Sequence, residues 1–403
     1  MTTPPEALYA SPNALAAHYR HFRVTGRLLL TGHSHQAWPD LGFDAQQRAW
    51  LDAAQYVDDK WEHAFAMADR VRRGFAALLD DPDGAVALGT NTHELVVRWL
   101  SALPLGRRRR LVTTTGEFHT IRRQLDRLAE EGITVVKVAA LPATTLADRL
   151  AQAVDDRTAA VLVSAVLYEN AHIVPNLARV HAACRRVGAE LLVDVYHALG
   201  VVPFSLRREG LAEAFVVGGG YKYCQLGEGN CFLRIPPACT LRPVITGWFS
   251  EFESLAHHDP AGGDEVSYGA GAARFAGATY DPTSHYRAGA VFDFFDVQGL
   301  RPDLLRQVSQ HQVGLLADRF DAFDADPAVI RRDRTVTLRE LGGFLALESP
   351  RAEELCRGLR DRGVLADYRA NVLRLGPAPY LSDQQLGTAM DALRSLVGEL
   401  ARR

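Results

Sequence analysis

The sequence predicts an α/β protein with a mostly parallel central sheet, helices on both faces of that sheet, and a smaller α+β lobe at the C-terminal end. Short, nearly continuous apolar runs alternate with amphipathic helical patterns through the middle of the chain, as in parallel sheets buried on both faces. Hydrophobic residues make up 47% of the 403 residues, which is enough for a large core. From about residue 291 the pattern becomes helical and then yields short strands.

The predicted elements follow one another in a regular order. Expected strands occupy residues 109–116, 133–140, 158–167, 189–197, 212–220, 230–236, 342–349 and 371–377. Amphipathic patterns predict helices at residues 119–132, 145–156, 176–188 and 302–320. We therefore divide the chain into an N-terminal segment that joins the small lobe, residues 1–50, a large domain, residues 51–290, and a small C-terminal domain, residues 291–403.

The composition argues against several classes of protein. The net charge of -3 gives no reason to expect a nucleic-acid partner, and the basic run at residues 106–111 is interpreted as a solvated turn. No apolar run reaches the length of a membrane span, and the first residues lack the order of a signal peptide. Five cysteines without framework spacing indicate free thiols and a cytoplasmic location.

Two polar residues follow neighbouring apolar strands. Asp194 closes the apolar run in residues 189–197, and Lys222 follows the three glycines that end the strand in residues 212–220. Both side chains should reach the carboxyl edge of the sheet, where such folds bind ligands. Taken alone, Asp194 also fits a helix cap. Together, a lysine amine with a lowered pKa and a carboxylate that keeps a pyridine nitrogen protonated are what pyridoxal phosphate (PLP) needs.

A phosphate site and a ring-stacking residue would complete such a site. Asn91, Thr92 and His93 stand directly before an apolar-periodic helix, and the N–H groups at a helix N-terminus bind phosphate well. The same residues also fit an ordinary helix cap. Phe118 lies just past the end of the strand in residues 109–116, so it is either a core residue or the residue that stacks on the cofactor ring.

These residues resemble the class-V aminotransferase group of PLP enzymes of fold type I, and within that group most of all kynureninase. The sequence YKY places Lys222 at the position that binds the cofactor covalently, with Tyr221 before it. The sequence DVYHALG matches the pattern Asp-x-x-His-x-x-Gly, which puts Asp194 at the pyridine nitrogen and His197 beside the ring. The resemblance covers most of the chain and implies a PLP-dependent enzyme with a small amino-acid substrate.

The resemblance also implies roles for residues in other parts of the chain. Phe118 would stack on the ring, and Asn91 and Thr92 would bind the phosphate, with His93 as an alternative register for one contact. In the C-terminal strand, Arg374 would take the substrate α-carboxylate. The remaining implied contacts are Trp248 with the phosphate, Thr279 with the phosphate of a partner subunit in a homodimer with shared active sites, and His33 and Ser34 in the N-terminal turn with the substrate.

The sequence departs from kynureninase in the substrate pocket. Ile121 stands where the family has an aspartate shortly after the stacking phenylalanine. The stretch AAQYVDDKW contains no histidine before Trp61, and no clear equivalent of a family asparagine lies beside TYDPT. The cofactor residues are therefore kept better than the residues that contact the aryl ring of kynurenine.

Several functions stay open on these residues. A kynureninase-like hydrolase would cleave the Cβ–Cγ bond of kynurenine or a related β-acyl amino acid and release alanine. Tyr221 is then the available acid, or else it only packs beside the lysine. An aminotransferase needs only Lys222 for its proton transfers. A β-eliminating lyase of the cysteine desulfurase type needs a mobile cysteine, whereas Cys356 lies in a helical pattern.

Two further interpretations are disfavoured. A PLP-binding sensor without enzymatic activity would usually carry an added DNA-binding segment, and the sequence offers no basic helix pair for one. The pair His33 and His35 is not expected to bind a metal, because further ligands would have to come from elsewhere in the fold.

Overall fold

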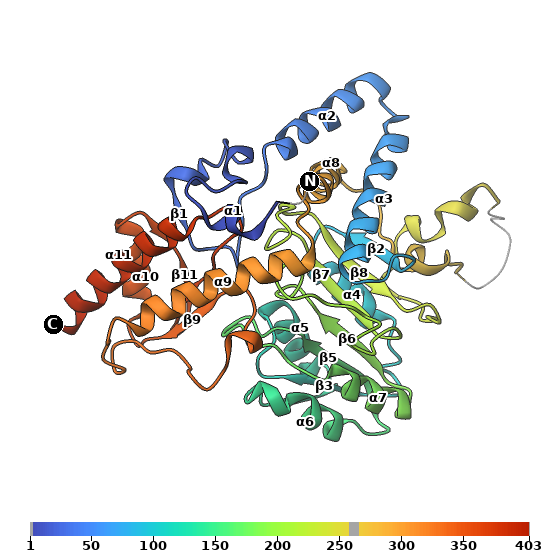
Figure 1. The fold of residues 1–403 in the computed structure, drawn as a ribbon. Helices are drawn as coiled ribbons and strands as arrows, with labels where there is room; N and C mark the ends of the chain where they lie inside the picture. Colours follow the sequence, from blue (N-terminus) through green and yellow to red (C-terminus); the bar gives the residue numbers. More distant parts are fainter. Residues whose placement is uncertain (1–2, 258–265, 403) are drawn as a thin grey trace.

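The computed structural model describes residues 3–257 and 266–402 and is built around a seven-stranded sheet (Figure 1). The strand order is β2-β8-β7-β6-β5-β3-β4. The strands are β2 Ala85–Gly89, β3 Arg110–Thr114, β4 Thr134–Val138, β5 Thr158–Ser164, β6 Glu190–Asp194, β7 Phe215–Gly219 and β8 Cys231–Ile235. β3 to β7 pair in parallel, whereas β8 pairs antiparallel with both β7 and the edge strand β2. The predicted mostly parallel sheet is confirmed.

Alternate residues of the buried strands face opposite sides of the sheet, and each side has its own core. Val161, Val163 and Val216 belong to one core, and Leu162 and Val217 belong to the other. The first side is covered by α3 Lys60–Leu78, α6 Leu146–Ala153, α7 Leu177–Val187 and α8 Thr283–Gln298, and the second by α4 Thr92–Ser101 and α5 His119–Glu130. Helices therefore cover both faces, as the apolar runs predict.

The C-terminal lobe contains a three-stranded antiparallel sheet in the order β11-β12-β9. Its elements are α9 Pro302–Asp321, β9 Leu345–Glu348, α10 Ala352–Asp361, β10 Val364–Leu365, β11 Asp367–Arg369, β12 Val372–Leu375 and α11 Asp383–Ala401. The N-terminal segment begins with α1 Pro5–Tyr9, and its strand β1 Leu28–Leu29 pairs in parallel with β10. Residue 50 lies within α2 Leu41–Tyr56 and residue 290 within α8, and the division into domains at these positions stays a prediction.

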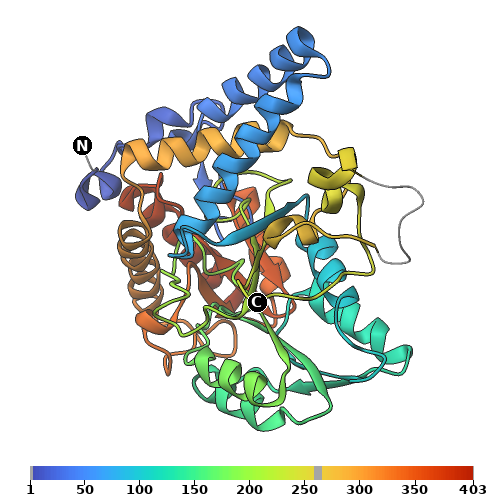
Figure 2. The same cartoon turned by 90° about the vertical axis from the view of Figure 1, so that its right-hand side faces the viewer.

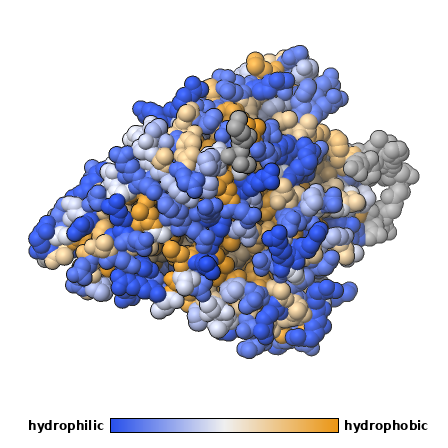
Figure 3. All heavy atoms as spheres, viewed as in Figure 1, coloured by the Kyte–Doolittle hydropathy of each residue, from blue (hydrophilic) through white to orange (hydrophobic). Residues whose placement is uncertain are grey.

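α2 and α3 form a hairpin that projects from the body of the molecule and packs on α8 (Figures 1 and 2). Figure 3 shows a largely polar face on which hydrophobic residues gather in patches near the middle. Short 3-10 helices occupy η1 Ala16–His18, η2 Val24–Gly26, η3 Ala143–Thr145, η4 Trp248–His257, η5 Gly271–Phe275 and η6 Leu338–Glu340. None of the helices in the described parts of the chain is long and apolar enough to cross a membrane.

Candidate active site

The carboxyl ends of β3, β5, β6 and β7 meet at one edge of the sheet and border a cavity of about 490 Å³. The strand register places Ser164 beside Asp194, and Asp194 beside Val217. The predicted residues that line this cavity are Asn91, Thr92, His93, Phe118, Asp194, His197, Tyr221 and Lys222. The fold thus brings most of the predicted cofactor residues together in a space that suits a small molecule.

Lys222 is buried just beyond the end of β7. A Cβ on Gly220 would overlap Leu226, which explains why a glycine precedes the lysine turn. The Nζ atom of Lys222 lies 2.5 Å from Nε2 of His197 and 4.9 Å from the centre of the Tyr196 ring. Burial lowers the pKa of Lys222 to about 7, so the amine is available as a nucleophile and as a base near neutral pH.

Asp194 ends β6 on the same cavity. Its Oδ1 accepts a hydrogen bond from the backbone N–H of Tyr196 at 2.8 Å. Burial raises the pKa of Asp194 to about 6, while that hydrogen bond and the charge of Lys222 oppose the rise. A carboxylate in this position can pair with a protonated ring nitrogen.

The turn before α4 is both a helix cap and a wall of the cavity. Oδ1 of Asn91 accepts from the N–H of Glu94 at 2.9 Å, and Nδ2 of Asn91 donates to Oε1 of Glu94 at 2.9 Å. The ordinary cap that the sequence left open is therefore present. Thr92 and His93 begin the helix and also line the cavity. The side chain of Asn91 is engaged in the cap, which leaves the N–H groups and side chains of Thr92 and His93 for the predicted phosphate contact.

Aromatic rings surround the lysine. The ring centres of Phe118 and Tyr221 lie 5.4 and 5.8 Å from Nζ of Lys222. Tyr168 also lines the cavity and meets Phe118 edge-on at 5.3 Å between ring centres. His35 stacks on Tyr221 at 4.8 Å. Burial raises the pKa of Tyr221 to about 12, so its hydroxyl keeps its proton at neutral pH.

Sequence reasoning missed several polar groups at this edge. Ser164 and Tyr168 line the cavity, and they follow the apolar run of β5 as Asp194 follows its own strand, so the same strand-end rule finds them. Glu117 is buried behind this wall. Its Oε2 accepts from Oγ of Ser164 at 2.6 Å, and its Oε1 accepts from Oγ1 of Thr114 at 2.7 Å. Burial raises the pKa of Glu117 to about 7.

Replacing Glu117 with glutamine is expected to stabilise the cofactor-free protein at pH 8 but not at pH 5. The ordinary pKa of 4.5 applies to the unfolded chain and about 7 to the folded one, so folding favours the protonated carboxyl. Its contribution to stability is fully present below the unfolded pKa and is lost as the pH rises through the folded pKa. The loss at pH 8 is on the order of a few kcal/mol. Urea denaturation at both pH values measures it, and an equal effect of Glu117→Gln at pH 5 and pH 8 would contradict the prediction.

The residue predicted to take the substrate carboxylate is engaged with an internal carboxylate. Arg374 is buried on β12 and donates from Nε and Nη2 to Asp367 on β11 at 2.9 and 2.6 Å. Its Nη1 donates to the carbonyl of Tyr168 at 2.7 Å. His33 is also buried, and its Nε2 lies 2.7 Å from Oδ1 of Asp367. His33 thus reaches Arg374 through Asp367, and the roles predicted for both residues toward the substrate stay predictions.

Three other predicted residues lie outside the walls of the cavity around Lys222. Ser34 is half-buried, and its Oγ lies 3.0 Å from Nδ1 of His35. Trp248 begins η4 and packs against Phe249, with 44% of its surface exposed. Thr279 lines an adjoining cavity of about 1110 Å³, which shares part of its wall with the first. The cofactor contacts predicted for Trp248 and Thr279 therefore need a group or a subunit beyond this single chain.

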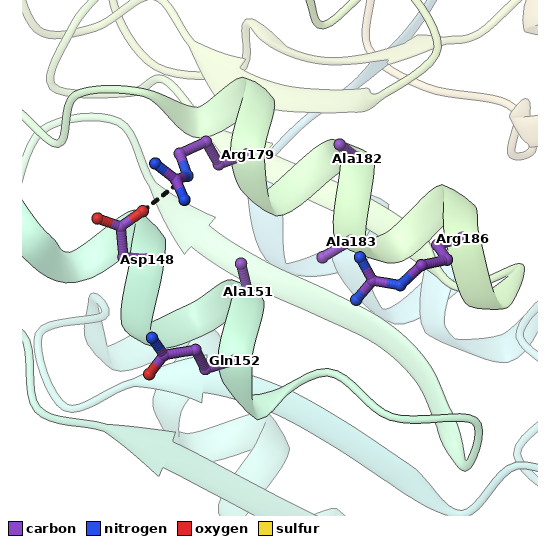
Figure 4. A pocket seen from close by; sticks show the side chains of 7 residues that line it. All are labelled: Asp148, Ala151, Gln152, Arg179, Ala182, Ala183 and Arg186. Atoms are coloured by element: carbon purple, nitrogen blue, oxygen red, sulfur yellow. Dashed lines mark ion pairs between the residues drawn. The ribbon is translucent and has the colours of Figure 1, made fainter.

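A further depression lies away from the strand ends. Figure 4 shows it between α6 and α7, where Arg179 pairs with Asp148 and Arg186 lies nearby. Its walls consist of helix side chains and include none of the predicted site residues. The depression is therefore separate from the candidate active site.

The residues at the sheet edge fit pyridoxal phosphate. The amine of Lys222, the carboxylate of Asp194 and the ring of Phe118 all border one cavity. Nδ1 of His197 is buried and has no hydrogen-bond partner among the residues that the structure describes. Buried polar atoms are normally satisfied, so an unpaired nitrogen on a residue of this cavity fits a site that holds a further polar group.

Comparison with known proteins relates the chain to kynureninases. Residues 305–393 match the family described as Kynureninase C-terminal domain. The kynureninase of Pseudomonas fluorescens is 27% identical over 335 residues, which cover 78% of this chain and 74% of that protein. The kynureninase of Burkholderia pseudomallei (strain 1106a) is 27% identical over 405 residues, which cover 94% of this chain and 91% of that protein. The chain is thus similar to kynureninases over most of its length, and its C-terminal part matches their family model.

Solved structures match the fold of the chain. A mutant of C-DES with glycine covalently linked to its PLP cofactor matches with a TM-score of 0.82 at 16% identity, covering 94% of this chain and 98% of that chain. Another structure describes C-DES as a cystine C-S lyase. The predicted fold type I is therefore confirmed, and so is the prediction of PLP as the cofactor.

Proposed function

We propose that this chain is a PLP-dependent hydrolase that cleaves the Cβ–Cγ bond of kynurenine or a related β-acyl amino acid and releases alanine. The observation that carries the proposal is the buried amine of Lys222 on a cavity that also holds Asp194 and Tyr221. The similarity to kynureninases, which extends over 94% of the chain in one case, supports the reaction class.

Four residues of the cavity have a task in the proposed reaction. The cofactor, when bound, supplies a ring that accepts an electron pair from the substrate. Asp194 would hold a proton at the ring nitrogen of the cofactor, and Phe118 would pack against the ring. Lys222 would hold the cofactor, and its amine, whose pKa is about 7, would then serve as the base for the substrate α-proton. Water would attack the γ-carbonyl, so that the acyl group leaves as a carboxylic acid. Tyr221, whose hydroxyl keeps its proton, would then donate that proton to the β-carbon.

Two other reactions share these first steps. An aminotransferase would need only Lys222 to move the proton. A lyase of the cysteine desulfurase type would need a reactive thiol. Sγ of Cys356 is buried on α10 and donates to the carbonyl of Ala366, while burial raises the pKa of Cys231, which lines the cavity, to about 12. Neither thiol is accessible as a thiolate, which favours the hydrolase over the desulfurase.

We also infer a cytoplasmic homodimer with shared active sites. Thr279, which is expected to reach the phosphate of a partner subunit, lines the second cavity. Trp248 and Phe252 are 44% and 45% exposed in the same segment, and a partner subunit would cover them. The cysteines of the chain are free thiols, which supports a reducing compartment.

L-Kynurenine is expected to be turned over about a hundredfold less efficiently than the preferred β-acyl amino acid. Ile121 lines the cavity where the family has an aspartate, and the stretch AAQYVDDKW, which ends at Trp61, contains no histidine. Each lost hydrogen bond to a buried polar group costs about 1–3 kcal/mol, so two losses produce an effect of this size. A substrate panel measures this difference in efficiency. It contains L-kynurenine, 3-hydroxykynurenine, other aryl- and acyl-alanines, cysteine, and an amino acid with an α-keto acid. The assays detect anthranilates, alanine, sulfide and new amino acid.

The products distinguish the candidate functions. Alanine released from a β-acyl amino acid supports the hydrolase, and Ile121→Asp, which restores the family residue, should raise the rate on kynurenine. New amino acid without alanine release would instead favour an aminotransferase, and sulfide a lyase. A kcat/KM for L-kynurenine of about 10⁴ M⁻¹s⁻¹ or above refutes the predicted specificity and leaves an ordinary kynureninase.

A further inference from the structure

The guanidinium group of Arg374 is largely occupied by the protein itself. An arginine has five N–H donors, and Arg374 uses one on Nε and one on Nη2 for Asp367 and one on Nη1 for the carbonyl of Tyr168. The side of the guanidinium formed by Nε and Nη2, which offers a bidentate fork, is therefore filled by an internal carboxylate. A substrate carboxylate can reach only the remaining N–H groups on Nη1 and Nη2.

The charges of this cluster cancel before any substrate arrives. Arg374 and Asp367 form a buried pair of opposite charges, with 3% and 19% of their side chains exposed. His33 adds no charge near neutral pH, because burial lowers its pKa to about 4. An entering carboxylate would therefore meet directed hydrogen bonds but no net positive charge from these three side chains. A buried carboxylate without a counter-charge is costly, so binding of the substrate carboxylate calls for a cation in addition to Arg374.

Arg369 is a cation beside the pair of Arg374 and Asp367. It ends β11, and its Nη1 lies 3.7 Å from Oδ2 of Asp367 and donates to the carbonyl of Tyr368 at 2.8 Å. Its Nε and Nη2 donate no hydrogen bond within residues 3–257 and 266–402, and 42% of its side chain is exposed. Its charge is felt at the cavity. Burial is the main cause of the lowered pKa values of Lys222 and His197. The charge of Arg374 and, to a smaller extent, that of Arg369 lower both further, while Asp367 opposes the shift at Lys222.

We propose that Arg369 supplies the net positive charge of the substrate-carboxylate site, while Arg374, neutralised by Asp367, supplies the geometry of the hydrogen bonds. The wild-type cluster of Arg374, Asp367 and Arg369 then carries one positive charge, which the α-carboxylate of an amino acid neutralises. This inference rests on the proposed function, because it requires an amino-acid carboxylate to enter the cavity beside Lys222.

The experiment compares two ligands that differ in the carboxylate alone. L-Alanine and L-alaninamide are titrated into the PLP-loaded protein by calorimetry, and each Kd is measured. Arg369→Met should weaken L-alanine about tenfold to a hundredfold, the range for a charge-assisted hydrogen bond, and leave L-alaninamide unchanged. Arg369→Lys should retain the affinity for L-alanine. Arg357→Met, on α10 with its partner Glu353, removes an exposed arginine of the same lobe and should change neither Kd.

A second substitution tests the charge balance itself. Adding Asp367→Asn to Arg369→Met returns the cluster to one positive charge, so the double variant should bind L-alanine more tightly than Arg369→Met alone. The affinity of Arg369→Met for L-alanine should also depend less on salt concentration than that of the wild type. This comparison tests the charge of Arg369 without a substitution at the buried Asp367.

The opposite results overturn the proposal. An unchanged Kd of Arg369→Met for L-alanine would exclude a role for its charge, and equal weakening of both ligands would show a structural role. Weaker binding in the double variant than in Arg369→Met would refute the charge balance, as would an unaltered salt dependence. If the wild type bound L-alaninamide and a β-acyl substrate but not L-alanine, only this inference would fail. A wild type that bound no amino-acid ligand would contradict the proposed function and this inference with it.

Discussion

Replacing Lys222 with alanine is expected to abolish covalent attachment of the cofactor and to reduce turnover by about a thousandfold or more. The substitution removes both the amine that holds the cofactor and the base that takes the α-proton. The neighbouring polar side chains do not replace it, because burial lowers the pKa of His197 and raises the pKa of Tyr221 to about 12. Steady-state turnover of the substrate found in the panel, together with the absorbance of the bound cofactor, measures the effect.

Lys137→Ala is the matched control for this change. Lys137 lies on β4, pairs with Asp126 on the surface and does not line the cavity. The Lys137→Ala control should keep the absorbance of the bound cofactor and the turnover of the wild type. A Lys222→Ala protein with wild-type turnover would show that another group performs the proton transfer.

Asp194→Asn is expected to reduce turnover by about a hundredfold to a thousandfold while the cofactor stays attached to Lys222. Asparagine has nearly the same shape and can still accept the hydrogen bond from the N–H of Tyr196. It carries no negative charge, so it cannot hold a proton on the ring nitrogen, and the ring becomes a poorer electron acceptor. The ratio of bound cofactor to protein and the value of kcat, measured on the same sample, separate binding from chemistry.

Two results would speak against this role of Asp194. Full activity in Asp194→Asn would mean that the charge is not used. Loss of the cofactor in parallel with activity would make Asp194 a residue of the binding site and leave the electronic role without support. Asp155→Asn, at a half-buried turn outside the cavity where Asp155 pairs with Arg157, is a control for the loss of one carboxylate and should keep the cofactor and the activity of the wild type.

The centre of the site could be predicted because strand ends are visible in a sequence. The apolar runs of β5, β6 and β7 are buried on both faces, so the first polar residues after them reach the same edge. Asp194 and Lys222 were found in this way, and both border the cavity. The fold class followed from the same runs and is confirmed by the sheet order and by the structural comparison.

Other parts of the site depend on contacts that no local pattern reveals. The pairing of Asp367 with Arg374 follows from the register of the β11–β12 hairpin, and His33 joins it from a segment more than three hundred positions away. Glu117 is buried by the packing of β3 and β5, which a strand prediction does not specify. β2 was not expected as a strand, because its apolar run continues directly into the turn before α4, which was interpreted as a phosphate-binding turn.

The measurement that tests the account most directly is the location of the cofactor on the chain. The protein contains three lysines, Lys60, Lys137 and Lys222, so borohydride reduction of the PLP-loaded protein followed by peptide mass spectrometry has three possible attachment points. The account predicts a reduced cofactor on the peptide that contains Lys222 and unmodified peptides for the other two lysines. A cofactor trapped on Lys60 or Lys137, or none trapped at all in a protein that turns over its substrate, would contradict it.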